Sequence, residues 1–328
     1  MFKNLTKPYI IAEIGSNHNG NMKICRKLII DAKKAGADAV KFQFFTLNNL
    51  FSESYFKNNK LSKKEIIKYS LKIDQLKYIC SLCKEYKIDV GFTPFGLDAV
   101  DILKKFKPTF YKIASMDCNN YDLIKKVAKT KKPIIISTGL SKKNEIKQAY
   151  LTAKKYNKNL ALLHCTSLYP PLDNQVNLKR IQYFNKIFNV PIGFSDHTLG
   201  IDFALVSIGL GSKIIEKHFT LDKKMSGWDH SMSVDKYELK KLVIKSEKIF
   251  KSLGSEKIFR VEPKKQLKMF RRSVVAEKNI KIGEKFSVAN ISLKRPGSGL
   301  EPKFLKKIIG KKSKNFIKED GLIKLSDF

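Results

Sequence analysis

Histidine, cysteine and tryptophan are scarce in this sequence, with five, five and one residues among 328. The cysteines are scattered, and Cys80 and Cys83 form a CxxC without a second pair, which does not support a zinc site or a redox motif. We therefore expect reduced thiols. No apolar run approaches the roughly 20 residues of a membrane helix, and the N-terminal segment lacks the features of a signal peptide. These absences favour a cytoplasmic protein.

Acidic residues are also few: 30 aspartates and glutamates stand against 65 lysines and arginines, giving a net charge of +35. Such an excess is compatible with nucleic-acid binding. However, the lysines are spread along segments with helical spacing, such as 33–40, 61–70 and 125–133, and do not form one basic-aromatic block. We favour a lysine-rich solvated surface and an anionic small-molecule substrate, with no nucleic-acid partner.

Short β-rich runs alternate with segments of helical periodicity along most of the chain. The runs span 9–15, 38–43, 89–94, 110–115, 133–138, 160–166, 190–195 and 212–219. Eight strand–helix units in about 250 residues predict an α/β fold of the (β/α)8 TIM-barrel type. An open doubly wound sheet is less favoured because no GxGxxG follows the first run.

The domain organisation follows from a change of character late in the chain. We predict a barrel domain over 1–255, a linker over 256–269 and a small, mainly β, domain over 270–328, where short β-like runs follow one another. The longest connection in the barrel, 45–71, is predicted to be a loop that acts as a functional lid.

Polar residues stand where the predicted strands end, and the carboxyl ends of barrel strands carry the chemistry of this fold. They are Glu13, Lys41, Gln43, Thr93, Lys112, Ser115, Ser137, Ser167, Tyr169, Ser195, His197, Glu216 and His218. Buried ions without partners would cost several kcal/mol each, so an ordinary core would not contain them. Two lysines with several hydroxyls predict a cradle for phosphate and carboxylate groups.

Two of the histidines occupy matching positions. His197 and His218 each follow an apolar run, and a helix-length segment, 199–211, separates the runs. The ends of parallel strands face the same side, so the two imidazoles could share a divalent metal. Acidic residues lie close to them in the sequence: Asp196, Glu216 and Asp229. The alternative is a pair of ordinary core or loop histidines, and we favour the metal site.

Several other candidate residues also have a purely structural explanation. Lys41 could extend its ammonium group to solvent, and Glu13 could cap a local turn. His164 lies within a strongly apolar run and is predicted to be a core histidine. His18 and His230 are evenly balanced between ordering a loop and contacting a substrate.

Several motifs together resemble one known family. They are IAEIGSNHNGN, AGADAVKFQ, YKIAS, IIISTG, LLHCTSLYP, GFSDHTLG, EKHFTLDK with a downstream DH, and RRSVVAE through KRPGSG. In this order and over nearly the whole chain, they are similar to the sialic acid synthase (N-acetylneuraminate synthase) family. The resemblance implies a barrel joined to a C-terminal SAF (antifreeze-like) domain. It also implies condensation of phosphoenolpyruvate with an N-acetylated amino sugar, giving a nine-carbon 2-keto acid and phosphate.

The resemblance further implies roles for individual residues. The metal, usually Mn2+ with Mg2+ or Co2+ as alternatives, would be held by His197 and His218. Phosphoenolpyruvate would be held by Lys41, Lys112, Ser115, Ser137 and Ser195, with Ser167 beside them. The reacting centre and the sugar would be lined by Gln43, Thr93, Tyr169 and the catalytic carboxylates Glu13, Glu216 and Asp229. Family members form homodimers, and Arg295, from the neighbouring subunit, would reach the N-acyl group of the sugar.

Some positions depart from the family pattern near the predicted sugar site. Ser167 replaces an asparagine found in some members, and Trp228 replaces a frequent proline. The default acceptor is N-acetylmannosamine, and the alternatives are the 2,4-diacetamido sugars that lead to legionaminate or pseudaminate. Two further alternatives are another phosphoenolpyruvate aldol-type synthase and a non-catalytic binding protein.

Overall fold

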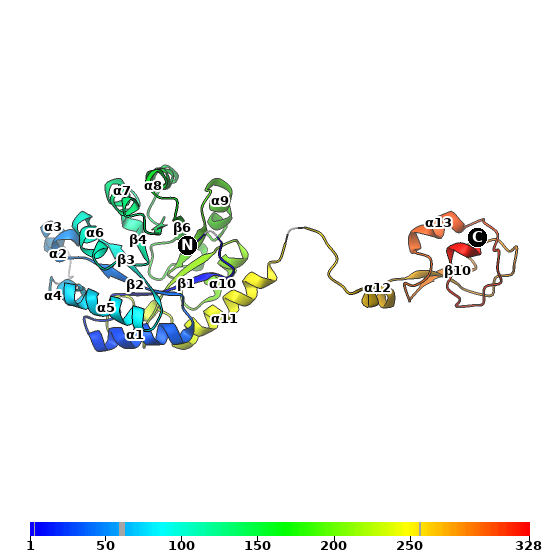
Figure 1. Ribbon diagram of the computed structural model, residues 1–328, viewed down its shortest axis with the longest axis horizontal. Coiled ribbons are helices and arrows are strands. Elements are labelled where there is room, and N and C mark those ends of the chain that lie inside the picture. The colour runs from blue at the N-terminus through cyan, green and yellow to red at the C-terminus, as the bar shows by residue number, and fades with distance from the viewer. Residues whose placement is uncertain (3, 59–62, 256) are drawn as a thin grey trace. The chain divides into compact units, whose positions relative to one another are not determined.

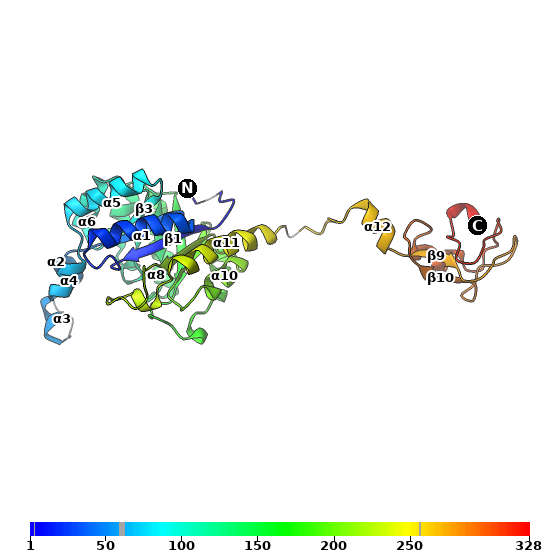
Figure 2. The same cartoon turned by 90° about the horizontal axis from the view of Figure 1, so that it is seen from below.

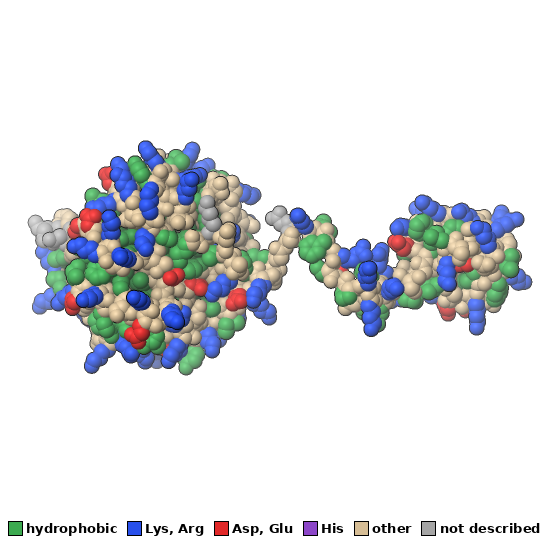
Figure 3. All heavy atoms as spheres, viewed as in Figure 1, with side chains coloured by type: hydrophobic (Ala, Val, Ile, Leu, Met, Phe, Trp, Pro, Cys, Tyr) green, Lys and Arg blue, Asp and Glu red, His purple; other side chains and the backbone are tan. Residues whose placement is uncertain are grey.

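The structure is a computed structural model that describes residues 1–2, 4–58, 63–255 and 257–328. The chain divides into two compact units, Met1–Gly254 and Ser255–Phe328, which are considered separately below. Lysine and arginine side chains are spread over the visible surface of both units (Figure 3).

The first unit is a closed barrel of eight parallel strands in the order β1 to β8. The strands are β1 (Tyr9–Gly15), β2 (Ala39–Phe44), β3 (Asp89–Pro94), β4 (Phe110–Ile113), β5 (Ile134–Ser137), β6 (Leu160–Cys165), β7 (Ile192–Asp196) and β8 (Ile214–His218). Strand β1 pairs with both β2 and β8, which closes the sheet. The predicted (β/α)8 barrel is confirmed.

Helices surround the strands (Figure 1). The main ones are α1 (Met22–Ala35), α5 (Ile73–Glu85), α6 (Leu97–Lys104), α7 (Tyr121–Lys129), α8 (Lys143–Tyr156), α9 (Lys179–Ile187), α10 (Asp202–Gly209) and α11 (Lys236–Ser252). Helix α1 shows how the sequence sets their limits: the Asn21 side chain accepts the first free amides, and Gly36 ends the helix with φ 93°. No helix in the described ranges is long and apolar enough to cross a membrane.

The connection predicted as a lid loop, 45–71, is partly helical, so its prediction as a loop was wrong. It contains α2 (Leu47–Leu50), α3 (Glu53–Asn58) and α4 (Lys63–Tyr69), while 59–62 lie outside the described residues. Ile66 and Tyr69, three residues apart on α4, pack with Phe45 and Phe95. This tertiary burial stabilises short helices whose sequences are mostly polar.

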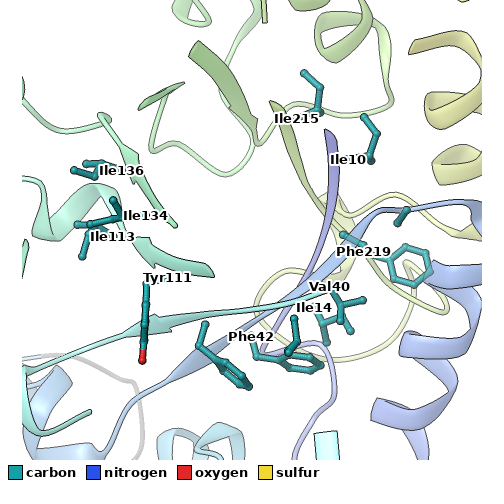
Figure 4. Packing of buried hydrophobic residues seen from close by; sticks show 14 of the residues in the cluster. Ile10, Ile14, Val40, Phe42, Tyr111, Ile113, Ile134, Ile136, Ile215 and Phe219 are labelled. Carbon is teal, nitrogen blue, oxygen red and sulfur yellow. The ribbon is translucent and has the colours of Figure 1, made fainter. Parts of the chain in front are cut away.

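Side chains along the strands point alternately into the barrel and toward the helices, which forms two apolar layers. The same alternation determines which side chains reach the site. On β1, Ile11 packs inside the barrel with Phe110 and Leu163, whereas Ile10 faces the helices. Figure 4 shows members of the outer layer, including Ile10, Val40 and Ile215. Since side chains alternate along a strand, the inward position after Ile11 is Glu13. The barrel interior is therefore apolar at the amino ends and polar at the carboxyl ends of the strands.

The second unit contains a small antiparallel sheet with its own core. Strands β9 (Ser273–Ala276) and β10 (Ile291–Lys294) pair side by side (Figure 2). Helix α13 (Leu305–Ile308) and isolated bridges complete it, around a core that includes Val274, Phe286 and Ile323. Helix α12 (Lys264–Phe270) occupies part of the stretch predicted as a linker.

Candidate active site

A cavity opens at the carboxyl ends of the barrel strands, and every strand contributes to it. It is lined by Glu13, Lys41, Gln43, Thr93, Phe95, Lys112, Ala114, Ser115, Ser137, Cys165, Tyr169, Ser195, His197, Glu216 and His218. Almost all the residues predicted from the strand ends are therefore brought together. Ser167, Asp229 and Arg295 lie elsewhere and are considered below.

One side of the cavity is built around a buried ion pair between β1 and β2. Lys41 Nζ lies 2.8 Å from Glu13 Oε1 and donates to Thr93 Oγ1 at 3.0 Å. Gln43 Nε2 donates to the same carboxylate oxygen at 3.2 Å. Lys41 is buried and does not extend to solvent. Burial raises the pKa of Glu13 to about 7, although the charge of Lys41 opposes that change.

A second lysine–carboxylate pair stands across the cavity. Lys112 Nζ donates to Ser137 Oγ at 2.6 Å and lies 3.5 Å from Glu216 Oε1. Ser195 Oγ donates to the same Glu216 oxygen at 2.8 Å. Burial alone would raise the pKa of Glu216, but the charges of Lys112 and Lys41 outweigh it and hold the pKa at about 2. Glu216 is therefore ionised at neutral pH, and the two lysines form the core of an anion cradle.

The two histidines face each other at the ends of β7 and β8, with ring centroids 5.4 Å apart. His197 Nδ1 lies 2.9 Å from the Thr166 carbonyl oxygen, so this nitrogen carries the proton and Nε2 is free to bind a metal. Burial, together with the charges of His197 and Lys41, holds the pKa of His218 well below its usual value. A neutral imidazole is the form that ligates metals.

Orphaned polar atoms in the cavity fit a divalent cation. Glu13 Oε2, Glu216 Oε2 and His218 Nδ1 are buried without a hydrogen-bond partner in the described chain. No cluster of three or more His, Cys, Asp or Glu residues arranged to enclose an ion occurs in the described ranges. The residues thus fit an open site, with two imidazole ligands and positions left for substrate.

Cys165 was not predicted as a site residue, yet it lines the cavity. Its Sγ lies 3.8 Å from His197 Nδ1. Burial would raise the pKa of this thiol, but His197 outweighs the effect and lowers it. Strand alternation could have identified Cys165, because Ala161 and Leu163 point into the barrel and the next inward position is Cys165. All five cysteines are free, as expected.

His164 points the opposite way, into the outer layer of the barrel. Its Nε2 lies 2.7 Å from the Val176 carbonyl oxygen, and its ring stacks on Phe194 with centroids 5.6 Å apart. Burial lowers the pKa of His164 to about 4. The prediction of a core histidine is confirmed.

Asp229 belongs to the loop after β8 and lies beside His218. Its Oδ2 lies 3.6 Å from His218 Nδ1 and accepts a hydrogen bond from Ser16 Oγ at 3.3 Å. Ser233 Oγ donates to the Asp229 carbonyl at 2.6 Å, and Asn17 Nδ2 donates to Ser233 Oγ at 2.9 Å. The first βα loop therefore holds the last one in place.

Histidines also order these two loops. His230 Nδ1 lies 2.7 Å from Thr220 Oγ1, and its Nε2 lies 3.3 Å from Asn19 Oδ1. His18 Nδ1 accepts the Gly20 amide at 3.0 Å. Both contacts order loops, which is one of the two alternatives that the sequence left open.

The lid meets this region through aromatic contact. Trp228, next to Asp229, packs edge-on against Tyr69 of α4 with ring centroids 4.6 Å apart. Trp228 remains partly exposed beside Asp229.

Like Asp229, Ser167 and Arg295 lie outside the cavity lining. Ser167 sits in the loop after β6, where a Cβ at Gly139 would collide with the hydroxyls of Ser167 and Ser115. The absence of that Cβ lets both hydroxyls approach the backbone. Arg295 is exposed on the second unit, with its guanidinium carbon 5.2 Å from the Phe270 ring centroid. Its predicted reach toward a partner subunit's sugar stays a prediction.

The fold and cavity define a TIM-barrel protein with an anion cradle and two facing imidazoles at the carboxyl ends of its strands, followed by a small β unit. The profile of the NeuB family matches residues 28–258, and that of the SAF domain matches residues 271–328. The chain belongs to the NeuB family and carries a C-terminal SAF domain.

Individual relatives cover almost the whole chain. It is 44% identical to an uncharacterized protein of Methanocaldococcus jannaschii, over 97% of this chain and 94% of that one. It is 39% identical to the N,N'-diacetyllegionaminic acid synthase of Campylobacter jejuni, over 98% and 100%. A crystal structure of the N-acetylneuraminic acid synthetase from Leptospira borgpetersenii superposes with a TM-score of 0.73 at 33% identity, covering 79% of this chain and 88% of that one. The resemblance stated from the motifs is confirmed.

Proposed function

We propose that the protein condenses phosphoenolpyruvate with an N-acetylated amino sugar, giving a nine-carbon 2-keto acid and phosphate. The observation that carries this proposal is the pair of buried lysines, Lys41 and Lys112, each set beside a carboxylate and a hydroxyl, next to two facing imidazoles. The legionaminic and neuraminic acid synthases among the relatives support it.

Phosphoenolpyruvate carries a phosphate and a carboxylate and needs two positive centres. Lys41 and Lys112 supply them, in a buried setting where charge-assisted hydrogen bonds are strong. Hydroxyls around the two lysines complete the cradle: Ser115, Ser137 and Ser195, with Ser167 behind them. Thr93 holds the Lys41 ammonium in position at 3.0 Å.

A divalent metal, Mn2+ with Mg2+ or Co2+ as alternatives, would be held by His197 and His218 and would supply Lewis-acid polarisation of the sugar aldehyde. The phosphoenolpyruvate C3 bonds to the aldehyde carbon, water adds at C2, and the C2–O bond to phosphate breaks. The chain holds phosphoenolpyruvate C3 next to the aldehyde carbon and excludes bulk water. Glu13, with its pKa raised to about 7, is suited to accept a proton from that water at neutral pH.

The remaining polar groups orient the acceptor. Glu216 stays ionised and fixes Ser195 Oγ at 2.8 Å. Gln43, Tyr169 and Asp229 stand around the opening and suit the hydroxyl groups of an open-chain sugar. We include in the proposal a cytoplasmic homodimer, in which Arg295 of the partner subunit binds the N-acyl group.

The acceptor has two candidates. N-acetylmannosamine is the default, and the name of the 39% identical Campylobacter relative favours a 2,4-diacetamido sugar as the second. The aromatic pair Trp228 and Tyr69 beside Asp229 suits a second apolar acetamido methyl group. A sugar panel distinguishes the two candidates.

The test is direct. Purified protein is incubated with phosphoenolpyruvate, Mn2+ and a panel of N-acetylmannosamine, 2,4-diacetamido hexoses and a phosphorylated hexosamine, and phosphate release and product mass are measured. We expect a nine-carbon 2-keto acid from at least one unphosphorylated sugar. Turnover of the phosphorylated sugar alone would indicate that the acceptor is neither of the two proposed sugars. Absence of turnover with every sugar would overturn the enzyme assignment.

A further inference from the structure

A fully buried ion pair lies directly behind the two histidines, outside the cavity. Lys217 Nζ lies 2.8 Å from Asp196 Oδ2, and both side chains are 0% exposed. The two residues are register partners on β7 and β8. Because side chains alternate along a strand, Ser195 and Glu216 point into the cavity, whereas Asp196 and Lys217 point to the helix side.

The pair also fixes the turn that carries His197. Asp196 Oδ1 accepts hydrogen bonds from the Thr198 amide at 2.9 Å and from the Thr198 hydroxyl at 2.8 Å. The Lys217 ammonium donates to the Thr198 carbonyl oxygen as well. His197 thus lies between two residues that are both bonded to Lys217, which is the chain neighbour of His218.

Stability does not explain why this position is ionic. Removing two charges from water is costly, and a well-packed apolar pair of similar volume is often at least as stable. Its neighbours two residues earlier, Phe194 and Ile215, are apolar and pack in the outer layer, where Figure 4 shows Ile215. What an ion pair adds there is directional bonding between two specific strand ends.

We infer that Asp196 and Lys217 are positioning residues, which clamp the ends of β7 and β8 so that His197 and His218 keep the spacing needed to share one divalent cation. This inference rests on the metal site of the proposed function. Neither residue touches the substrate or the metal; each acts through the adjacent histidine. This positioning role explains why two charges are buried here, although an apolar pair would avoid the cost of removing them from water.

The test compares a charge-free double variant with a control on the same strand face. Asp196→Leu with Lys217→Met removes the clamp without leaving an unpaired charge. Thr198→Val is a milder variant that removes only the hydroxyl donor, in case the double variant does not fold. Ile215→Ala is the control, because it disturbs the same buried layer two residues from Lys217 and leaves the clamp intact.

The measurement is the dissociation constant of Mn2+ for the metal-freed full-length protein, by titration calorimetry without substrate. We expect binding roughly 10-fold weaker in the double variant and about 3-fold weaker in Thr198→Val, as for residues that orient metal ligands. Ile215→Ala should lower the melting temperature but bind Mn2+ like the wild type. Saturating Mn2+ should restore kcat in the double variant.

Three outcomes would overturn the inference. The first is wild-type affinity for Mn2+ in the double variant or, if that does not fold, in Thr198→Val. The second is equal weakening by Ile215→Ala, which would assign the effect to general packing. The third is no Mn2+ binding by the wild-type protein, which would also remove the metal site from the proposed function.

Discussion

Lys112 and Glu216 stand 3.5 Å apart inside the barrel, both buried, and each is held by a serine hydroxyl from a neighbouring strand. The pair adds little stability, because burying charges offsets most of their attraction. Since it opens onto the cavity, we propose that it serves binding. An incoming phosphate or carboxylate group would offer Lys112 a further partner.

Replacing Lys112 by methionine should abolish most of that binding. Loss of a buried charge-assisted bond of about 2–3 kcal/mol predicts a fall of roughly 30- to 150-fold in kcat/KM for phosphoenolpyruvate. The matched control is Lys126→Met, because Lys126 pairs with Asp101 on the surface and is remote from the cavity. Steady-state kinetics measures both variants. An equal loss in Lys126→Met, or no loss in Lys112→Met, would remove Lys112 from the cradle.

The buried His164 should make the folded protein less stable in acid. Its pKa is about 4 in the folded protein, against 6.5 as the ordinary value, so the unfolded chain binds the extra proton first as the pH falls. Neutral His164 therefore leaves the free energy of unfolding undiminished above about pH 6.5, and this free energy decreases as the pH falls toward 4. At pH 4.5 the decrease due to His164 is about 2–3 kcal/mol.

The measurement is the free energy of unfolding in urea at pH 7 and at pH 4.5. His164→Gln should be less stable than the wild type at pH 7 but lose about 2 kcal/mol less on acidification. His18, whose pKa burial also lowers to about 4, keeps part of the acid sensitivity in both proteins. An identical pH dependence in the variant would show that His164 does not titrate as described.

Asn17 is predicted to matter for the sugar through the loop of Asp229. Its side-chain amide donates to the Phe219 carbonyl at 3.0 Å and to Ser233 Oγ at 2.9 Å. Asn17→Ala leaves both acceptors buried without this donor, a cost of about 1–3 kcal/mol, and loosens the loop. We expect a KM for the sugar raised about 10-fold, with little change in the KM for phosphoenolpyruvate.

Asn185→Ala is the control for that variant. Asn185 also bonds two backbone carbonyls, those of Ile181 and Gly211, but it lies on α9 on the outside of the barrel. It should leave both Michaelis constants unchanged. A rise in the sugar KM of the same size in Asn185→Ala would indicate a general loss of stability.

Arg295→Ala tests the role proposed for the second unit. Since the guanidinium group is proposed to bind the N-acyl group from the partner subunit, the variant should weaken sugar use more than phosphoenolpyruvate binding. The control is Arg260→Ala, a basic residue of the same unit outside the KRPGSG turn. Equal effects of Arg295→Ala on both substrates would contradict the reaching role.

Strand alternation made most of the site predictable from the sequence. In a barrel, Glu13, Lys41 and His218 point inward because they occupy inward positions that alternate with outward residues of the same strand. The same rule would have found Cys165. By contrast, the helices of the 45–71 connection could not be predicted, since Ile66 and Tyr69 are buried through tertiary contacts with residues such as Phe45 and Phe95.

Contacts between distant loops also lay beyond the sequence. The bonds from Asn17 to Ser233 and between His230 and Asn19 join the first and last loops of the barrel, and no local pattern indicates them. The Asp196–Lys217 pair depends on the register of β7 against β8, which closure of the barrel sets.

The central claim is a condensation in which the C–O bond of phosphoenolpyruvate breaks. It is tested most directly with phosphoenolpyruvate carrying 18O in the bridging position between C2 and phosphorus, incubated with Mn2+ and the sugar that turns over. The account predicts that the label leaves with the released phosphate, while the nine-carbon keto acid takes its C2 oxygen from water. Label retained in the keto acid would contradict it.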